Sequence, residues 1–135
     1  MLQEALAMLE KGKFVFLATC DGGKPHVRPF GFMGQHEGKL WFCTATNKAV
    51  YTQLSHNPNV ELAVTTVPDM LTLRIEGQAA FEDNKAVKKA ILEKSDVVRS
   101  IYKTPDNPIF VVFSIAHGEG TITDMKGNPP KHFTL

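Results

Sequence analysis

Six short stretches rich in apolar and β-branched residues follow one another along this sequence of 135 residues, with turn-forming residues between them. Stretches of this length and composition are typical of β-strands. The first two are joined by Asp21-Gly22-Gly23-Lys24, which predicts a hairpin because glycine tolerates positive φ. The expected strands cover residues 14–20, 25–33, 39–44, 60–67, 71–81 and 109–115, and 121–123 continue the last one after a bend at 117–120.

Three short helices are expected around these strands. The first places Leu2, Leu6 and Leu9 on one face, and the third is capped by Asp83 or Asn84. The expected helices cover residues 1–11, 47–55 and 84–94, while 34–38 form a turn and the residues after 130 form a short tail. Six strands in hairpin order with few helices predict a mainly β fold, an antiparallel barrel with its helices outside.

Composition and charge narrow the class of protein. With 43% apolar residues and a formal net charge of +1, we expect one domain over residues 1–135 that binds neither nucleic acid nor an anionic membrane. No apolar run reaches the roughly 18 residues of a membrane span, and the N-terminus lacks a signal-peptide pattern, so we expect a cytoplasmic protein. Cys20 and Cys43 form no Cys-x-x-Cys pair and are expected to be buried, reduced thiols.

The segment Thr44-Ala45-Thr46-Asn47-Lys48 joins an expected strand to an expected helix. Backbone N–H groups at a helix N-terminus are unpaired, and together with the helix dipole they attract anions. Lys48 adds a positive charge in the first turn, where a cation is otherwise unfavourable. Two interpretations stay open on this pattern: a simple capping segment with a surface lysine, or a phosphate site.

The expected strand Pro25-His26-Val27-Arg28-Pro29-Phe30 is irregular. Pro29 cannot donate to a sheet ladder, so this stretch is expected at an edge, a bulge or a ligand. Arg28 lies between apolar residues and is either a solvated edge residue or a planar cation that faces a heteroaromatic ligand.

Other kinds of site find little support in the sequence. The five histidines, His26, His36, His56, His117 and His132, lack the spacing of a metal site, so no metal is expected. Glycine-rich phosphate loops and a Gly-x-Ser-x-Gly elbow are absent, and no pair of carboxylates stands out for acid–base catalysis. No catalytic residue is therefore assigned, and a chain of this kind would take its chemistry from a cofactor.

These segments resemble the pyridoxamine-phosphate-oxidase-like flavoproteins, the FMN-binding split barrels, and specifically their small single-domain branch with nitroimidazole-resistance-type proteins. The resemblance covers nearly the whole chain. It rests on residues 16–19, 23–29, 40–44, 57–62 and 75–79, in the expected order, and on the Gly127-Asn128-Pro129-Pro130 tail.

The resemblance implies a six-stranded antiparallel split barrel, Greek-key-like, and a homodimer with two FMN molecules at the subunit interface. It implies that the strand through Arg28 faces the flavin ring, that the segment ending at Lys48 holds the phosphate, and that Arg74 reaches the partner subunit's flavin. The expected cofactor-binding residues are His26, Val27, Arg28, Pro29, Phe30, Cys43, Thr44, Thr46, Asn47, Lys48 and Arg74.

The phosphate segment differs from that of the true oxidases. Where they carry Ser-Arg-Lys, this chain has Lys48-Ala49-Val50, so one lysine replaces two basic residues. Their C-terminal segments for the substrate phosphate are not evident either, so vitamin B6 oxidation is not expected.

The function implied by the resemblance is an FMN-dependent oxidoreductase. It would pass hydride from a reduced nicotinamide through FMN to a small acceptor, such as a nitroaromatic compound. His26 is the only candidate acid beside the expected ring. The alternatives are a flavin carrier or redox sensor without its own substrate, the same fold with haem or deazaflavin, and a ligand-free interaction module; haem would need His117 or His132 as its axial ligand.

Overall fold

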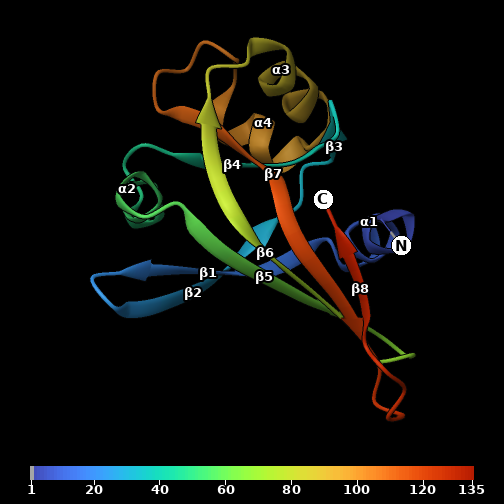
Figure 1. The fold of residues 1–135 in the computed structure, drawn as a ribbon. Helices are drawn as coiled ribbons and strands as arrows, with labels where there is room; N and C mark the ends of the chain where they lie inside the picture. The colour runs from blue at the N-terminus through green and yellow to red at the C-terminus, as the bar shows by residue number, and fades with distance from the viewer. Residues whose placement is uncertain (1) are drawn as a thin grey trace.

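The computed structural model describes residues 2–135 and contains eight strands and four helices in this range. The strands form one antiparallel sheet in the order β2-β1-β5-β6-β7-β4-β3, and β8 pairs with β7. The elements are α1 (Leu2–Gly12), β1 (Phe14–Asp21), β2 (Lys24–Gly31), β3 (Gln35–His36), β4 (Lys39–Ala45), α2 (Ala49–His56), β5 (Asn59–Thr66), β6 (Leu71–Glu82), α3 (Lys85–Lys94), α4 (Asp96–Tyr102), β7 (Phe110–Thr123) and β8 (Lys131–Thr134). Helices α3 and α4 lie together at one end of the sheet, and the β1–β2 hairpin extends on the side of α2 (Figure 1).

The sheet curls into a split barrel, as predicted. Hairpins join β1 to β2 and β5 to β6, whereas the pairs β1–β5 and β4–β7 are formed by strands far apart in sequence. The segment after β2 connects the β1 side of the sheet to β4. The N–H of Phe32 donates to the carbonyl of Lys13, just before β1, and the N–H of Met33 donates to the carbonyl of Trp41 in β4. No helix within residues 2–135 is both long and apolar enough to cross a membrane.

Strand β2 is an edge strand, which confirms the prediction made from Pro29. It pairs only with β1, where Pro29 lies opposite Phe16. Gly22 and Gly23 both have positive φ in the turn between the two strands, as the predicted hairpin requires. Because β2 has a neighbouring strand on one side only, the missing backbone N–H of Pro29 is tolerated there.

Two apolar clusters lie on opposite faces of β4. Leu40 and Phe42 face the barrel interior, whereas Trp41 and Ala45 pack in a second cluster with α3 and α4. Burial on both faces explains why β4 is almost continuously apolar, and burial of each large side chain contributes roughly 1.5–3 kcal/mol. Packing on both faces therefore fixes the end of β4, from which the loop to α2 begins.

Three elements differ from the sequence-based predictions. Helix α4 lies in a segment for which no element was predicted, β8 replaces part of the expected tail, and short β3 occupies the expected turn at 34–38. Where a bend was expected at 117–120, β7 continues as one strand, but its pairing with β6 is irregular and shifts register between Gly77 and Ala79, opposite Gly118 and Ile115. The strand count is therefore eight rather than six.

Tertiary packing accounts for these differences. Ser95 caps α4 by accepting a hydrogen bond from the N–H of Val98 at 3.2 Å, and the helix buries Tyr102 against Phe110. Strand β8 places the ring of Phe133 directly over Gly120, where a Cβ atom would overlap it. Such contacts between residues distant in sequence cannot be predicted from a short local stretch.

Candidate functional site

A cavity of about 690 Å³ lies between the β2–β4 region and the junction of α3 and α4. We call it the main cavity. Five of the predicted site residues line it: Pro29, Phe30, Cys43, Thr44 and Lys48. The other lining residues come from the α1–β1 connection, the segment after β2, and α3–α4: Leu9, Glu10, Lys13, Phe14, Gly31, Phe32, Met33, Lys94, Ser95, Asp96, Val97, Val98, Ile101 and Tyr102. The volume lies in the range of small-molecule sites.

The segment predicted to hold a phosphate ends at the N-terminus of α2. Lys48 is the N-cap residue, and no side chain caps the helix. The first turn contains no acidic residue, so its N–H groups and dipole are not compensated by a side-chain anion. The capping interpretation of this segment therefore lacks the hydrogen bond on which it depends, while the lysine and the free helix terminus both favour an anion.

Arg28 is held by uncharged oxygen atoms. Its guanidinium donates to the carbonyl of Leu17 at 3.2 Å, to the hydroxyl of Thr19 at 2.9 Å and to the side-chain oxygen of Gln53 at 2.7 Å. Thr19 donates to the same oxygen of Gln53 at 2.6 Å. Desolvation by burial lowers the pKa of Arg28. Among residues 2–135, no carboxylate lies within ion-pair distance of this guanidinium, so its charge is available to a bound anion.

Arg28 and the five remaining predicted residues lie outside the lining of the main cavity. His26 and Val27 are exposed on the outer part of β2, and Thr46 and Asn47 lie in the loop before α2. Arg74 lies on β6, where its guanidinium pairs with Glu61 at 2.5 Å. Within one chain, the structure thus brings together the residues at the β2 and β4 ends, and separates Arg74 from them.

The wall formed by α3, α4 and the end of α1 was missed from sequence. Lys94 reaches the main cavity while paired with Glu10 at 3.1 Å, and its ammonium lies 5.8 Å from the centre of the Phe32 ring. Lys13 enters from the α1–β1 connection, and in the described part of the chain it has no carboxylate partner. The one local sequence signal for this wall is the spacing of Val97 and Ile101, two apolar residues four positions apart, as on one face of a helix. In the structure both side chains are exposed.

Cys43 and Tyr102 contribute neutral groups to the main cavity. Burial raises the pKa of the Cys43 thiol to about 12, so it stays protonated near neutral pH and is not a nucleophile. Burial also raises the pKa of Tyr102, with a smaller contribution from Cys43. Both cysteines are free, as predicted, but they are half-buried rather than fully buried.

Comparison with known proteins agrees with this architecture. The family model described as "Pyridoxamine 5'-phosphate oxidase" matches residues 1–123, while a search of curated proteins finds no match. A solved NimC/NimA family protein from Clostridium acetobutylicum is 34% identical with a TM-score of 0.90, over 98% of this chain and 91% of that chain.

Two more distant structures share the fold. A pyridoxamine 5'-phosphate oxidase-related, FMN-binding protein from Nostoc punctiforme is 19% identical with a TM-score of 0.79, over 98% of this chain and 87% of that chain. A heme-binding protein from Mycobacterium smegmatis is 18% identical with a TM-score of 0.79, over 97% of this chain and 56% of that chain. The extent of the family match, together with the likeness to the NimC/NimA protein, shows that this chain belongs to the pyridoxamine 5'-phosphate oxidase family.

Proposed function

We propose that this chain is an FMN-binding flavoprotein whose main cavity holds the flavin. The observation that carries the proposal is that five residues expected to bind FMN, from two separate strands and a loop, line one cavity of about 690 Å³. The FMN-binding relative from Nostoc punctiforme supports the choice of ligand. A purely structural role for these five residues would not require them to line a common cavity.

The chemistry of the lining fits the two ends of FMN. Phe30 and Phe32 offer aromatic surface to a flat heteroaromatic ring. Lys48 and the uncapped N-terminus of α2 offer positive charge and N–H donors to a phosphate. One lysine in place of an Arg-Lys pair is then sufficient because the helix terminus supplies further donors.

Arg28 is proposed to act on the flavin as a fixed positive charge. Its hydrogen bonds to Thr19 and Gln53 fix the guanidinium without neutralising it. A cation held in this way would stabilise negative charge on the N1–C2 or N5 region of the flavin ring at no cost in reorientation.

The proposed activity is that of an oxidoreductase. When bound, FMN supplies hydride chemistry, from a reduced nicotinamide to a small acceptor such as a nitroaromatic compound. The protein's own groups bind and orient, since the thiol of Cys43 and the hydroxyl of Tyr102 stay neutral and give an apolar, uncharged wall. His26 is exposed on β2 and remains the candidate for a proton donor.

A homodimer is proposed because β1 and β2 expose one apolar face. Phe14, Phe16 and Val27 are 63%, 58% and 66% exposed. Phe16 lies opposite Pro29 and Val27 opposite Ala18, so these side chains share one face of the hairpin. A contiguous apolar face of this kind marks an interaction surface, and a second copy would cover it. Arg74 is then proposed to approach the partner subunit's flavin.

Other ligands on the same fold are separated by spectroscopy. The heme-binding relative from Mycobacterium smegmatis makes haem a candidate, but none of the described residues that line the main cavity is a histidine. His117 lines a different pocket, beside Pro58 and Gly77. The absorption spectrum of the purified protein separates FMN from haem and deazaflavin, and steady-state assays with NADH and NADPH separate an enzyme from a flavin carrier or redox sensor.

The proposal is tested by adding FMN to flavin-free protein. We expect a shifted flavin absorption spectrum and a melting temperature that rises with FMN concentration, because a ligand that binds only the folded state stabilises it. If neither changes up to millimolar FMN, the flavin proposal is wrong and the ligand-free interaction module gains support.

A further inference from the structure

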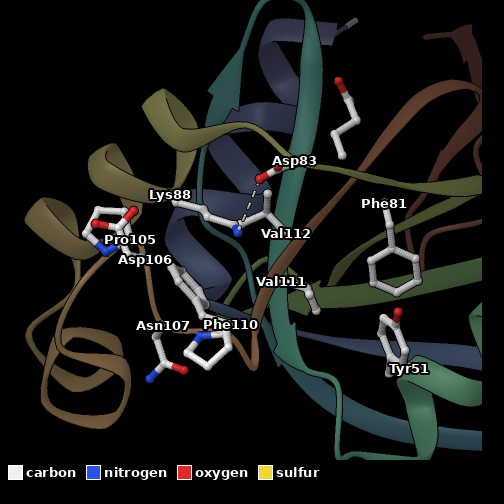
Figure 2. A pocket seen from close by; sticks show the side chains of 12 residues that line it. Tyr51, Phe81, Asp83, Lys88, Pro105, Asp106, Asn107, Phe110, Val111 and Val112 are labelled. Carbon is white, nitrogen blue, oxygen red and sulfur yellow. Dashed lines mark ion pairs between the residues drawn. The ribbon is translucent and has the colours of Figure 1, made fainter.

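A second pocket, of about 440 Å³, lies beyond the end of β6, between α2, α3 and the loop 105–108. We call it the α3 pocket. Figure 2 shows Lys88 of α3 and Phe110 on one side, and the rings of Tyr51 and Phe81 on the other. Its lining residues are Tyr51, Phe81, Glu82, Asp83, Lys88, Pro105, Asp106, Asn107, Pro108, Phe110, Val111 and Val112. None of them lines the main cavity.

Lys88 is the unusual group in the α3 pocket. Its side chain is only 12% exposed, although lysine is rarely buried without a partner. The nearest carboxylate oxygen, on Asp83, lies 3.7 Å from the ammonium, beyond hydrogen-bond distance, and the Asp83 side chain is 99% exposed. The ammonium also lies 5.9 Å from the centre of the Phe110 ring.

The ammonium of Lys88 therefore has unused hydrogen-bond donors. Its ion-pair partner Asp83, at 3.7 Å, lies beyond hydrogen-bond distance, and the contact with Phe110 offers attraction without a hydrogen-bond acceptor. A cation withdrawn from water is stabilised by an anion that enters the same pocket.

Besides Asp83, two carboxylates line the α3 pocket, and both are already compensated. Glu82 accepts from Lys39 at 3.1 Å and from Ser114 at 3.0 Å. Asp106 pairs with Lys85 at 3.0 Å on the exposed rim. These carboxylates therefore do not compete strongly for Lys88.

The walls of the α3 pocket favour an aromatic body on that anion. Tyr51 and Phe81 pack with ring centres 4.9 Å apart, and together with Val111 and Val112 they give one apolar side to a pocket whose other lining residues include charged and amide side chains. A phosphate would require several donors, whereas a monoanion with one ring matches a single ammonium beside apolar walls.

We propose that the α3 pocket is a second ligand site, which binds a small aromatic carboxylate through Lys88. The proposal does not depend on the flavin, because Lys88 and Tyr51 lie outside the main cavity.

The test is titration of the full chain with benzoate, followed by amide chemical shifts. We expect benzoate to shift Val111 and Asp106 rather than Val97 of the main cavity, with or without FMN. Benzyl alcohol, which keeps the ring but lacks the charge, should bind at least tenfold more weakly. Absence of saturable benzoate binding, shifts confined to the main cavity, or competition with FMN would overturn the proposal.

Two variants and one control complete the test. Lys88→Met should weaken benzoate at least tenfold while leaving benzyl alcohol unchanged, and Lys89→Met, on the exposed face of α3, should leave both unchanged. Lys88→Arg keeps the cation and should keep benzoate affinity within a few-fold of the parent, which keeps the proposal testable if Lys88→Met fails to fold. A loss of benzoate binding in Lys88→Arg as large as that expected for Lys88→Met would contradict the role of the charge of Lys88.

Discussion

The guanidinium of Arg28 donates a hydrogen bond to the side-chain oxygen of Gln53 at 2.7 Å, and this contact ties β2 to α2. Both elements contribute to the proposed flavin site, since Pro29 of β2 and Lys48, the N-cap residue of α2, line the main cavity. The pair therefore links the two ends of the site.

Removal of the Gln53 acceptor should destabilise the protein. Gln53→Leu leaves Arg28 and Thr19 without a shared oxygen, and we expect a loss of about 1–3 kcal/mol in the free energy of unfolding. Gln53→Glu retains the acceptor and neutralises Arg28, so stability should be kept while FMN affinity falls. Chemical denaturation and FMN titration measure the two effects; unchanged FMN affinity in Gln53→Glu would mean that the charge of Arg28 does not act on the flavin.

The exposed face of β1 should control the oligomeric state. Phe16→Lys places a charge on the proposed dimer face, and we expect light scattering to show a monomer where the parent chain forms a dimer. Met125→Lys changes an exposed apolar residue elsewhere and should leave the dimer intact. A parent protein that is monomeric at every concentration would exclude this interface.

Any side chain at position 120 should destabilise the protein, because it would overlap the Phe133 ring of β8. Gly120→Ala places a methyl group against the Phe133 ring, and we expect a loss of roughly 1–3 kcal/mol in unfolding free energy. Phe133→Leu should recover part of the loss when combined with Gly120→Ala. Thermal unfolding of both single variants and the double variant gives the coupling, and strictly additive losses would argue against this contact.

Stability should fall at high pH because of Cys43. Its folded pKa, about 12, lies above its ordinary value of 9.0, so the folded state holds this proton more tightly than the unfolded state. The contribution is complete below pH 9 and is lost as pH rises toward 12, by at most about 1.4 kcal/mol per pH unit. Cys43→Ala should show a flatter decline across this interval than the parent, and parallel curves would contradict the assignment.

The sequence predicted those parts of the fold that depend on residues close together in the chain. The turn at Gly22 and Gly23, the edge position forced by Pro29 and the cap at Asn84 all depend on neighbouring residues, and all three are confirmed. Helix α4 and β8 depend on distant partners, Phe110 and Gly120 respectively, and were missed for that reason.

The candidate site was only partly predictable for the same reason. Residues on β2 and β4 were found because their order along the chain carried the family resemblance. Lys13 and Lys94 reach the main cavity only through packing of α1 and α3, which no short motif encodes. The acceptors of Arg28 likewise come from two other elements, β1 and α2.

The proposed position of the FMN phosphate at Lys48 is tested by comparing FMN with riboflavin in Lys48→Ala. The two flavins differ only in the phosphate, so we expect roughly tenfold weaker FMN binding, about 1.4 kcal/mol, with riboflavin within twofold of the parent. Lys89→Ala, on the exposed face of α3, should leave both affinities unchanged. Equal losses for FMN and riboflavin, or no loss for FMN, would show that the phosphate does not lie at Lys48.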